Sequence, residues 1–343
     1  PGKSYQVTKY WNKPFSMKHW LENAYNYTST KTGEFNGNSE YDDDIVILVD
    51  PDMVQQRPFQ NDFSKYPTEF WRPYFREKKL HSTVKRGRAI AQDYSFGQKW
   101  YTVGSMNLTH VLSDNTDSSS PLYDLNEDHT RYMYSAGPPY ILTMYDMYRV
   151  VTYWTKFVPK LLDLKSSMMI EMYGYCLAAA HLQIQHQLAN GFMISNIHME
   201  EGWHFLNNHP KKTEIISNGD SSSYNPVCNI TQFLPEELPN VIHFCQRYGI
   251  GEYFISKYKI PTDLLSCDAP LMAVPPLDID LDTNYVHYGD DSIQEFPRKQ
   301  LQMYSTYITC SLLNILNDAA TFYKRHHCSL ANYNKTFHIP KSK

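Results

Sequence analysis

The chain has 343 residues, of which 15% are aromatic, so it can build a sizeable core and is not a generally disordered protein. Its formal net charge at pH 7 is −4, and it contains no Lys/Arg-rich block of the kind that a polyanion-binding face needs. Nucleic acid is therefore not an expected partner.

The first predicted elements are a helix, a loop and a strand. Apolar residues recur at helical spacing as far as Ala24, and Pro14 and Ser16 suit the start of that helix. A polar stretch over residues 28–40, rich in Gly, Asn and Ser, is predicted to be a loop. The continuous apolar run at residues 45–49 then predicts a strand that is covered on both faces, as in α/β folds.

Two helices are predicted in the middle of the chain. Residues 137–139, Gly-Pro-Pro, predict a turn before the first of them. Apolar side chains then recur at helical spacing from Met144, until Pro159 is expected to end or kink the helix. The second helix is predicted over residues 167–188.

Towards the carboxyl end, residues 241–244 predict a buried strand, and the Pro- and Asp-rich residues 268–298 predict a surface segment. The apolar pattern of residues 301–322 predicts an amphipathic helix that docks on the core. These elements indicate an α/β fold. We expect residues 1–277 to form one domain, with residues 278–343 wrapping it and docking their helix on the same domain.

Two carboxylates follow the first predicted strand in the tripeptide Asp50-Pro51-Asp52. Pro51 biases Asp50 towards an extended backbone, in which residues two apart project to the same side. Carboxylates at such close range repel each other, and a divalent cation would relieve the repulsion. The carboxyl end of a strand is also where open α/β sheets bind ligands. The alternative is a solvated turn, because Asp and Pro are common turn residues.

A second group of candidate site residues accompanies the strand predicted at residues 241–244. His243 can complete a carboxylate site for manganese. Gly249 and Gly251 allow close approach of a cofactor to the backbone, and Lys257 supplies a positive charge for a diphosphate. Taken singly, a hydrogen-bonded core histidine and an ordinary surface lysine are the simpler interpretations.

Two features favour an oxidising compartment. Sequons that can accept N-linked glycans in a secreted chain occur at Asn26, Asn107, Asn229 and Asn334. The 6 cysteines are even in number and lack the CxxC spacing of a zinc site. No apolar stretch approaches the length that crosses a bilayer, so a membrane is expected to be reached only through an anchor outside this sequence.

Two further expectations concern modification of the chain. Cys245 and Cys267 flank the segment of Lys257, and a disulfide between them would close a loop of roughly twenty residues and stabilise it by about 3 kcal/mol. We predict that disulfide. We also expect Asn107 and Asn229 to be exposed, because a glycan acceptor must reach solvent.

Several blocks of the sequence resemble the plant and algal peptidyl glycosyltransferases, namely the hydroxyproline O-arabinosyltransferases and their peptidyl-serine α-galactosyltransferase relatives. The resemblance covers most of residues 10–277, and its most specific parts are the Glu-Met-Tyr-Gly-Tyr block and the Asp-Pro-Asp that follows an apolar strand. The matching blocks are Asn12-Lys13-Pro14, residues 47–53, Gly137-Pro138-Pro139-Tyr140, residues 171–175, His243-Phe244-Cys245 and residues 251–267.

The resemblance implies a GT-A fold, a Rossmann-like mixed sheet flanked by helices, with a UDP-sugar donor and Mn²⁺ (or Mg²⁺). It implies transfer to hydroxyproline or serine of secreted or cell-wall proteins, with retention of configuration, in the Golgi or ER lumen or outside the cell. Asp50 and Asp52 fall on the metal-binding DxD motif, and by analogy with other GT-A enzymes His243 falls on a further metal ligand. Lys257 falls on the diphosphate contact. Glu171 falls in the block that borders the donor sugar, as a candidate catalytic residue.

Some alternatives stay open. A carboxylate in the first turns of a helix is favoured by the helix dipole, which is sufficient to explain Glu171. In the family, an opening strand that contributes to the base pocket precedes the matching part, and this chain starts too late to contain it. An inactive GT-like domain that binds glycan or protein, or a structural secreted glycoprotein, are therefore the competing hypotheses.

Overall fold

In the computed structural model, contacts divide the chain into two compact units: unit 1 is residues 1–50 and 60–190, and unit 2 is residues 51–59 and 191–343. The range 1–277, for which we predicted one domain, contributes residues 1–50 and 60–190 to unit 1 and residues 51–59 and 191–277 to unit 2. The structure describes residues 12–30, 35–78, 80–94, 96–105, 107–113, 120–164, 169–208, 226–228, 233–277, 279, 281, 298–330, 333 and 335–340.

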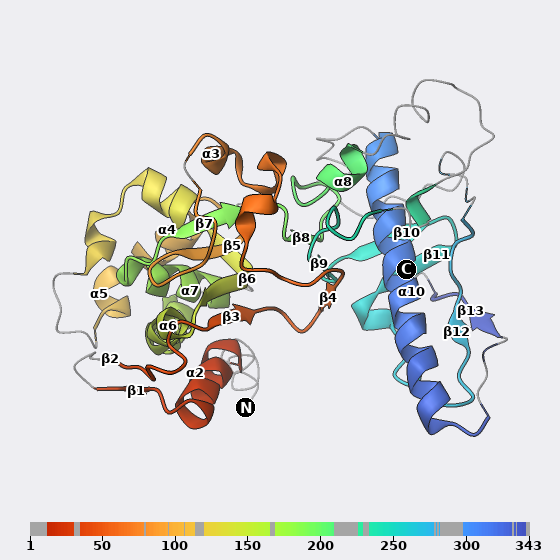
Figure 1. The fold of residues 1–343 in the computed structure, drawn as a ribbon, viewed down its shortest axis with the longest axis horizontal. Coiled ribbons are helices and arrows are strands. Elements are labelled where there is room, and N and C mark those ends of the chain that lie inside the picture. Colours follow the sequence, from red (N-terminus) through yellow and green to blue (C-terminus); the bar gives the residue numbers. More distant parts are fainter. Residues whose placement is uncertain are drawn as a thin grey trace. The chain divides into compact units, whose positions relative to one another are not determined.

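Unit 1 is built on a four-stranded mixed sheet (Figure 1). Its strands, in spatial order, are β3 (Ile45–Leu48), β6 (Ala136–Thr143), β5 (Ala89–Asp93) and β7 (His186–Ala189). Strands β3 and β5 both run antiparallel to β6, whereas β7 runs parallel to β5. Together with the helices of this unit, the mixed sheet agrees with the predicted α/β class.

Strand β3 forms at the predicted residues but lies at an edge of the sheet. Only Val46 is buried, whereas Ile45, Ile47 and Leu48 are half-buried. The side chains on both faces of this strand are covered in part, so the complete covering that we predicted is not observed. An apolar run reports that side chains avoid water, but it does not report where in the sheet the strand lies.

Strand β6 contains residues 137–139, for which we predicted a turn. Every residue of this strand is buried. Proline cannot donate a hydrogen bond to a neighbouring strand, so two prolines inside a sheet require an irregularity. The register of β5 against β6 shifts between Ala91 and Gln92, and Gly137 pairs with Gln92. The irregular pairing accommodates a sequence whose composition is typical of turns.

We expect the substitution Gly137→Ala to destabilise unit 1. A Cβ atom at this position would overlap the aromatic ring of Tyr94, so the ring or the strand must shift. Overpacking of this kind costs about 1–3 kcal/mol of the free energy of unfolding, measurable by denaturant unfolding. Combining Gly137→Ala with Tyr94→Ala should give a smaller loss than the sum of the two single losses. Strict additivity would contradict the proposed overlap.

The helices among the described residues of unit 1 are α2 (Asn12–Ala24), α3 (Pro73–Arg76), α4 (Lys99–Ser105), α5 (Leu108–Val111), α6 (Met144–Leu164) and α7 (Ile170–His181). Helices α6 and α7 pack on each other and on β6, and α2 packs on α6 (Figure 1).

The helix predicted before the first strand is confirmed as α2. Helix α6 continues past Pro159 instead of ending there. Helix α7 is shorter than the predicted 167–188, because the residues after it form β7. A short antiparallel pair, β1 (Thr28–Ser29) and β2 (Phe35–Asn36), lies in the predicted loop.

The described part of unit 2 contains three small sheets. The first has the order β4 (Met53–Gln55), β9 (Val241–His243) and β8 (Met193–Ile194), in which β9 is antiparallel to β4 and parallel to β8. The second is the hairpin of β10 (Arg247–Ile250) and β11 (Tyr253–Ser256), and the third pairs β12 (Leu271–Met272) with β13 (Thr336–Phe337). Strand β9 confirms the buried strand predicted at residues 241–244.

Helix α10 (Arg298–His327) organises the core of unit 2 by packing on β10, β11, β12 and the short turn Pro226–Cys228. The predicted docking of this helix is confirmed, but it is not amphipathic throughout. All of residues 301–313 are buried, including polar side chains such as Gln302 and Thr306. A second, short helix of this unit is α8 (His204–Asn207).

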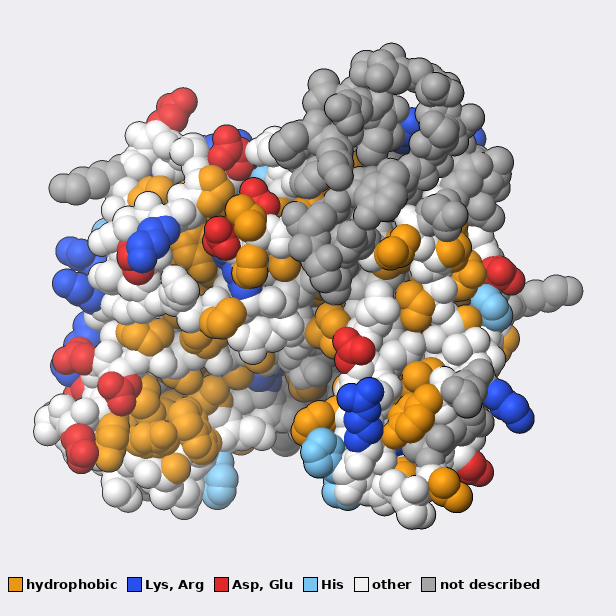
Figure 2. Space-filling model, turned by 45° about the vertical axis from the view of Figure 1, so that its right-hand side comes forward, with side chains coloured by type: hydrophobic (Ala, Val, Ile, Leu, Met, Phe, Trp, Pro, Cys, Tyr) orange, Lys and Arg blue, Asp and Glu red, His pale blue; other side chains and the backbone are white. Residues whose placement is uncertain are grey.

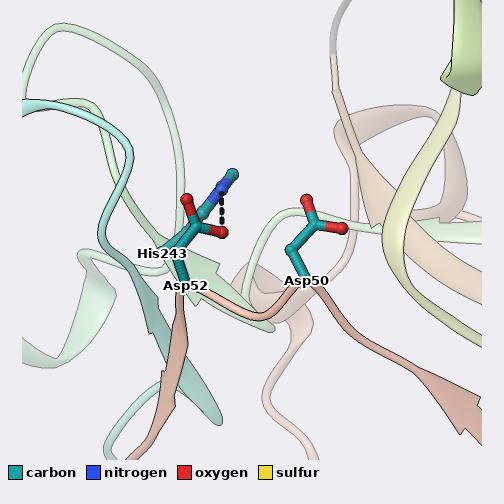
Figure 3. A group of neighbouring side chains, drawn as sticks. All are labelled: Asp50, Asp52 and His243. Atoms are coloured by element: carbon teal, nitrogen blue, oxygen red, sulfur yellow. Dashed lines mark ion pairs between the residues drawn. The ribbon is translucent and has the colours of Figure 1, made fainter. Parts of the chain in front are cut away.

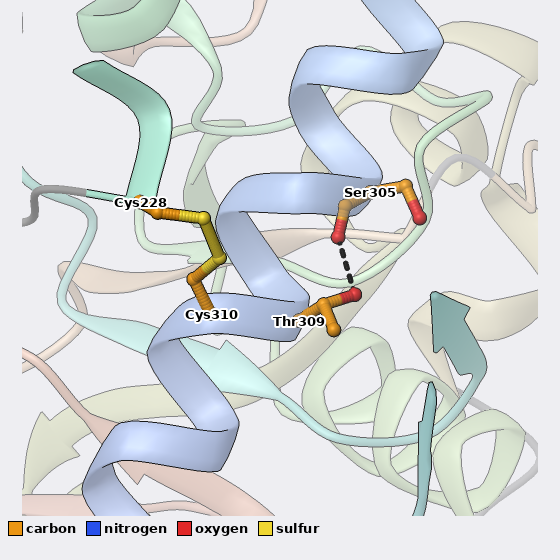
Figure 4. The surroundings of a disulfide bond; sticks show 4 residues. All are labelled: Cys228, Ser305, Thr309 and Cys310. Atoms are coloured by element: carbon orange, nitrogen blue, oxygen red, sulfur yellow. Dashed lines mark hydrogen bonds between the residues drawn. A yellow bond between two sulfur atoms is a disulfide. The ribbon is translucent and has the colours of Figure 1, made fainter. Parts of the chain in front are cut away.

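Both disulfides of the described chain lie in unit 2 and link the carboxyl-terminal segment to earlier parts of the sequence. Cys228 is joined to Cys310 of α10 (Figure 4), and Cys267 is joined to Cys328, with Cα–Cα distances of 5.4 and 5.6 Å. The predicted Cys245–Cys267 disulfide is wrong, since Cys245 is free. Proximity in sequence misled the prediction, because the packing of α10 brings more distant cysteines together.

The exposed surface bears on the predicted glycan acceptors and on the distribution of charge. Asn26 and Asn107 are exposed, as a glycan acceptor must be, whereas Asn229 and Asn334 lie outside the described residues. On the face shown in Figure 2, basic side chains are interspersed with acidic ones among the described residues. No described helix combines the length and apolar character that spanning a membrane requires.

Candidate metal site

Asp52 and His243 lie side by side because β4 and β9 pair antiparallel. Met53 is opposite His243 in this ladder, and the N–H of Phe244 donates to the carbonyl oxygen of Asp52 at 2.8 Å. Oδ1 of Asp52 is 3.3 Å from Nε2 of His243. We expected the ligands at the carboxyl ends of neighbouring strands. Asp50 follows the carboxyl end of β3 and His243 ends β9, whereas Asp52 directly precedes the amino end of β4.

Asp50 precedes Asp52 by two residues, and the carboxylates of both project to the same side of the segment that joins them (Figure 3). Ligand atoms of Asp50, Asp52 and His243 all lie within 4.8 Å of one another. This is the spacing of side chains that can share one cation, because ligand distances to hard divalent ions are roughly 2 Å. The three predicted ligands are thus near each other, and the binding of an ion stays a prediction.

Lys13 of α2 places its ammonium group between two carboxylates of unit 1. It forms an ion pair with Asp50, and its Nζ lies 2.7 Å from Oε1 of Glu171. All three side chains are largely buried, with Lys13 16% exposed and each carboxylate 18% exposed. Burial alone would lower the pKa of Lys13, but Glu171 and Asp50 together raise it. Lys13 therefore stays charged and holds the two carboxylates together.

Glu171 lies in the first turn of helix α7. Burial raises the pKa of Glu171, and the ammonium of Lys13 opposes this rise. The carbonyl oxygen of Glu171 accepts a hydrogen bond from Nε1 of Trp154 in α6 at 2.7 Å. A Cβ atom on Gly174 would lie only 2.6 Å from Cγ2 of Val158, so this glycine allows α7 to approach α6 closely.

Lys257 follows β11, and its Nζ lies 2.5 Å from Oδ2 of Asp52. Burial opposes ionisation of Asp52, but His243 and Lys257 outweigh it and hold the pKa of this carboxyl well below its usual range. Burial would likewise lower the pKa of His243, whereas Asp52 and Cys245 raise it to about 10. His243 is therefore an imidazolium at neutral pH when no metal is bound. Metal binding must release that proton, because only neutral imidazole is a ligand.

The structure gives the two predicted cofactor-binding glycines roles in the β10–β11 hairpin. Gly249 pairs with Phe254, and its carbonyl oxygen accepts a hydrogen bond from the hydroxyl of Ser305 at 2.8 Å. Ser305 lies on α10, next to the turn that carries Cys310 (Figure 4). Gly251 has a φ of +55° in the turn of the hairpin, a conformation that favours glycine. Packing and turn geometry account for both residues.

Comparison of the chain with models of protein families, with curated proteins and with solved structures gave no match. The chemistry of the site is therefore argued from its residues. Two carboxylates and one imidazole form a mixed oxygen and nitrogen ligand set that first-row divalent metals accept, whereas Mg²⁺ prefers oxygen ligands alone. Lys13 was missed as a site residue in the sequence, where the only signal for it was its place in the Asn-Lys-Pro block.

Proposed function

We propose that this protein is a metal-dependent glycosyltransferase of the GT-A type. It transfers a sugar from a UDP-sugar, with retention, to hydroxyproline or serine of secreted proteins. The observation that carries the proposal is the cluster of Asp50, Asp52 and His243, whose ligand atoms lie within 4.8 Å of one another. These are the residues that the resemblance implies as metal ligands, and His243 is distant in sequence from Asp50 and Asp52.

Contacts between the resembling blocks support the same proposal. Lys13 of the Asn-Lys-Pro block joins Asp50 of the Asp-Pro-Asp block to Glu171 of the Glu-Met-Tyr-Gly-Tyr block. The last block also packs against the Gly-Pro-Pro-Tyr block, because the rings of Tyr140 and Tyr175 stack with centroids 3.7 Å apart. Segments that resemble one family in sequence order are thus in contact within unit 1, as a common site would require.

In this function Asp50, Asp52 and His243 would hold Mn²⁺, which supplies positive charge against the diphosphate of the departing UDP. Lys257 now pairs with Asp52, and its ammonium can instead pair with a phosphate oxygen once a cation neutralises that carboxylate. Lys13 acts as a positioning residue, because it holds the carboxylate of Glu171 in place. Glu171 is the polar group that we assign to the donor sugar.

The disulfides support a place in the secretory pathway. Disulfides form and persist in oxidising compartments, and two are present in unit 2. Exposed sequons at Asn26 and Asn107 agree with this environment. We therefore propose the Golgi or ER lumen, or the cell exterior, as the location of the protein.

The second candidate is a GT-like domain that binds glycan or protein without turnover. One observation favours it: the acidic groups of the cluster already have cationic partners, since Asp50 pairs with Lys13 and Asp52 pairs with Lys257 and His243. Such a network satisfies its own charges without a metal ion. The cluster would then be a structural ion-pair network.

A two-step experiment separates the candidates. Binding of Mn²⁺ to the protein is first measured by the loss of the free-ion electron paramagnetic resonance signal. Hydrolysis of a panel of UDP-sugars is then measured with and without Mn²⁺. We expect saturable Mn²⁺ binding and Mn²⁺-dependent hydrolysis of one donor. Binding without hydrolysis of any donor would favour the second candidate, and absence of Mn²⁺ binding would remove the metal site altogether.

A further inference from the structure

A separate cluster of basic residues lies on a tight turn of unit 1, residues 85–88. The N–H of Arg88 donates to the carbonyl oxygen of Lys85 at 2.9 Å, and these two residues form an isolated antiparallel bridge. Residues directly opposite in such a bridge place their side chains on the same face, with Cβ atoms about 4.5–5.5 Å apart. Two exposed cations therefore face each other across the turn.

The two facing cations differ in their ion pairing from Arg86, the basic residue between them. Arg86 is neutralised, because its Nε lies 2.7 Å from Asp43 and its guanidinium 3.3 Å from Asp42. Neither Lys85 nor Arg88 forms an ion pair with any carboxylate of the residues that the structure describes. Like charges directly opposite destabilise a strand pair, so this arrangement leaves a repulsion that an anion between the two side chains would relieve.

The turn is held in place by buried contacts. The N–H of Gly87, whose φ is +70°, donates to Oδ2 of Asp146 at 2.6 Å. Asp146 is buried on α6, where Arg149 lies 3.4 Å from its other oxygen. Val84 immediately precedes the turn, and its N–H donates to Oδ1 of Asn61 at 2.7 Å. These anchors fix the backbone from which the two facing cations project.

An open pocket adjoins the turn. Its volume is about 820 Å³, and its walls include Lys85, Arg88, Asn61, Val84 and Thr143, together with Asp43 and Arg86, which pair with each other. Pockets of a few hundred to about 1,000 Å³ are typical of small-molecule sites. Burial and the positive charge of Arg88 both lower the pKa of the nearby His81, which agrees with a positive potential in this region.

The pocket is distinct from the candidate metal site. It includes Ile45, the first residue of β3, which pairs with Thr143 at the end of β6. Asp50 lies beyond the opposite end of β3. Five residues of extended chain span roughly 16 Å, so one ligand group cannot contact both Asp50 and the basic turn.

We propose that the turn of residues 85–88 binds a tetrahedral oxyanion, a phosphate or sulfate group carried by a small molecule that occupies the pocket. The planar guanidinium of Arg88 can donate two hydrogen bonds to such a group, and the ammonium of Lys85 adds a point charge. The anion neutralises both facing cations at once. This binding site does not depend on the proposed glycosyltransferase function.

The test measures binding of inorganic phosphate and, in a separate arm, inorganic sulfate to the full chain by isothermal titration calorimetry at low ionic strength. We expect one saturable site for at least one of these anions. The double substitution Lys85→Gln/Arg88→Gln should weaken that binding at least about 10-fold, because it removes two charge-assisted contacts. The arm with the tighter binding identifies the phosphate or the sulfate class.

The matched control is Lys65→Gln/Lys78→Gln, which removes the same charge from exposed positions of unit 1. This control should bind the anion as the wild type does. An equal loss in both double variants would show attraction by net charge alone and overturn the site, as would the absence of saturable binding to wild type. Thermal unfolding verifies that both variants are folded, which is expected because all four side chains are exposed.

Discussion

Replacement of Asp52 by alanine is expected to lower Mn²⁺ affinity and UDP-sugar turnover by at least about 100-fold. Even residues that only support a metal ligand typically contribute 10–100-fold, and Asp52 is itself a proposed ligand. It is also the common partner of His243 and Lys257, so its loss leaves two cations beside the site. The positive charge left beside the site opposes the entry of a metal cation.

The same substitution should leave the fold of unit 2 intact. Asp52 is half-buried rather than part of the apolar core, and the pairing of β4 with β9 uses its backbone carbonyl. The side chain of His243 can lose its proton once Asp52 is absent, which reduces the remaining repulsion. Asp50→Ala should behave in the same way. His243→Ala should weaken Mn²⁺ binding less, because water can replace one ligand among several.

The experiment compares Mn²⁺ affinity, UDP-sugar hydrolysis and thermal unfolding in each variant. Asp263→Ala is the matched control, because Asp263 is an exposed carboxylate of the same unit. The control should retain wild-type Mn²⁺ affinity. If Asp52→Ala also retained it while staying folded, Asp52 would not be a ligand. If Mn²⁺ affinity fell but no donor were hydrolysed even by wild type, the site would bind metal without turnover.

Removal of the disulfide between Cys228 and Cys310 should cause the largest loss of stability. The two cysteines are separated by 82 residues, and the loop-entropy model gives about 4.5 kcal/mol for closing a loop of that length. Both are buried, and Cys310 lies in the fully buried part of α10. A typical protein is stable by only about 5–15 kcal/mol, so this loss would be a large fraction of the total.

The variant is Cys228→Ala/Cys310→Ala, and the measurement is denaturant unfolding under non-reducing conditions. Cys245→Ala is the control, because Cys245 is free in the structure and is the residue that sequence proximity would pair with Cys267. The control should unfold close to the wild-type midpoint. Greater destabilisation by Cys245→Ala than by the double variant would contradict the observed pairing, and non-reducing peptide mapping would then identify the true bridges.

Local features were predictable from the sequence. The strand before Asp50, the strand that ends at His243 and the long carboxyl-terminal helix all form where the apolar pattern predicts them. Pro51 favours an extended backbone, and the carboxylates of Asp50 and Asp52 do project to one side (Figure 3). Each of these features depends on a few consecutive residues, whose backbone preferences and side-chain periodicity are contained in the sequence itself.

Non-local features needed the tertiary structure. The Gly-Pro-Pro of residues 137–139 is typical of a turn, yet packing against β5 makes it part of a buried strand. Cys267 pairs with Cys328 because α10 ends next to it, and Lys13 reaches both Asp50 and Glu171 because α2 lies against α6. Sequence periodicity reports which side chains avoid water, but not which distant segment covers them. The free energy of packing the whole chain decides those partners.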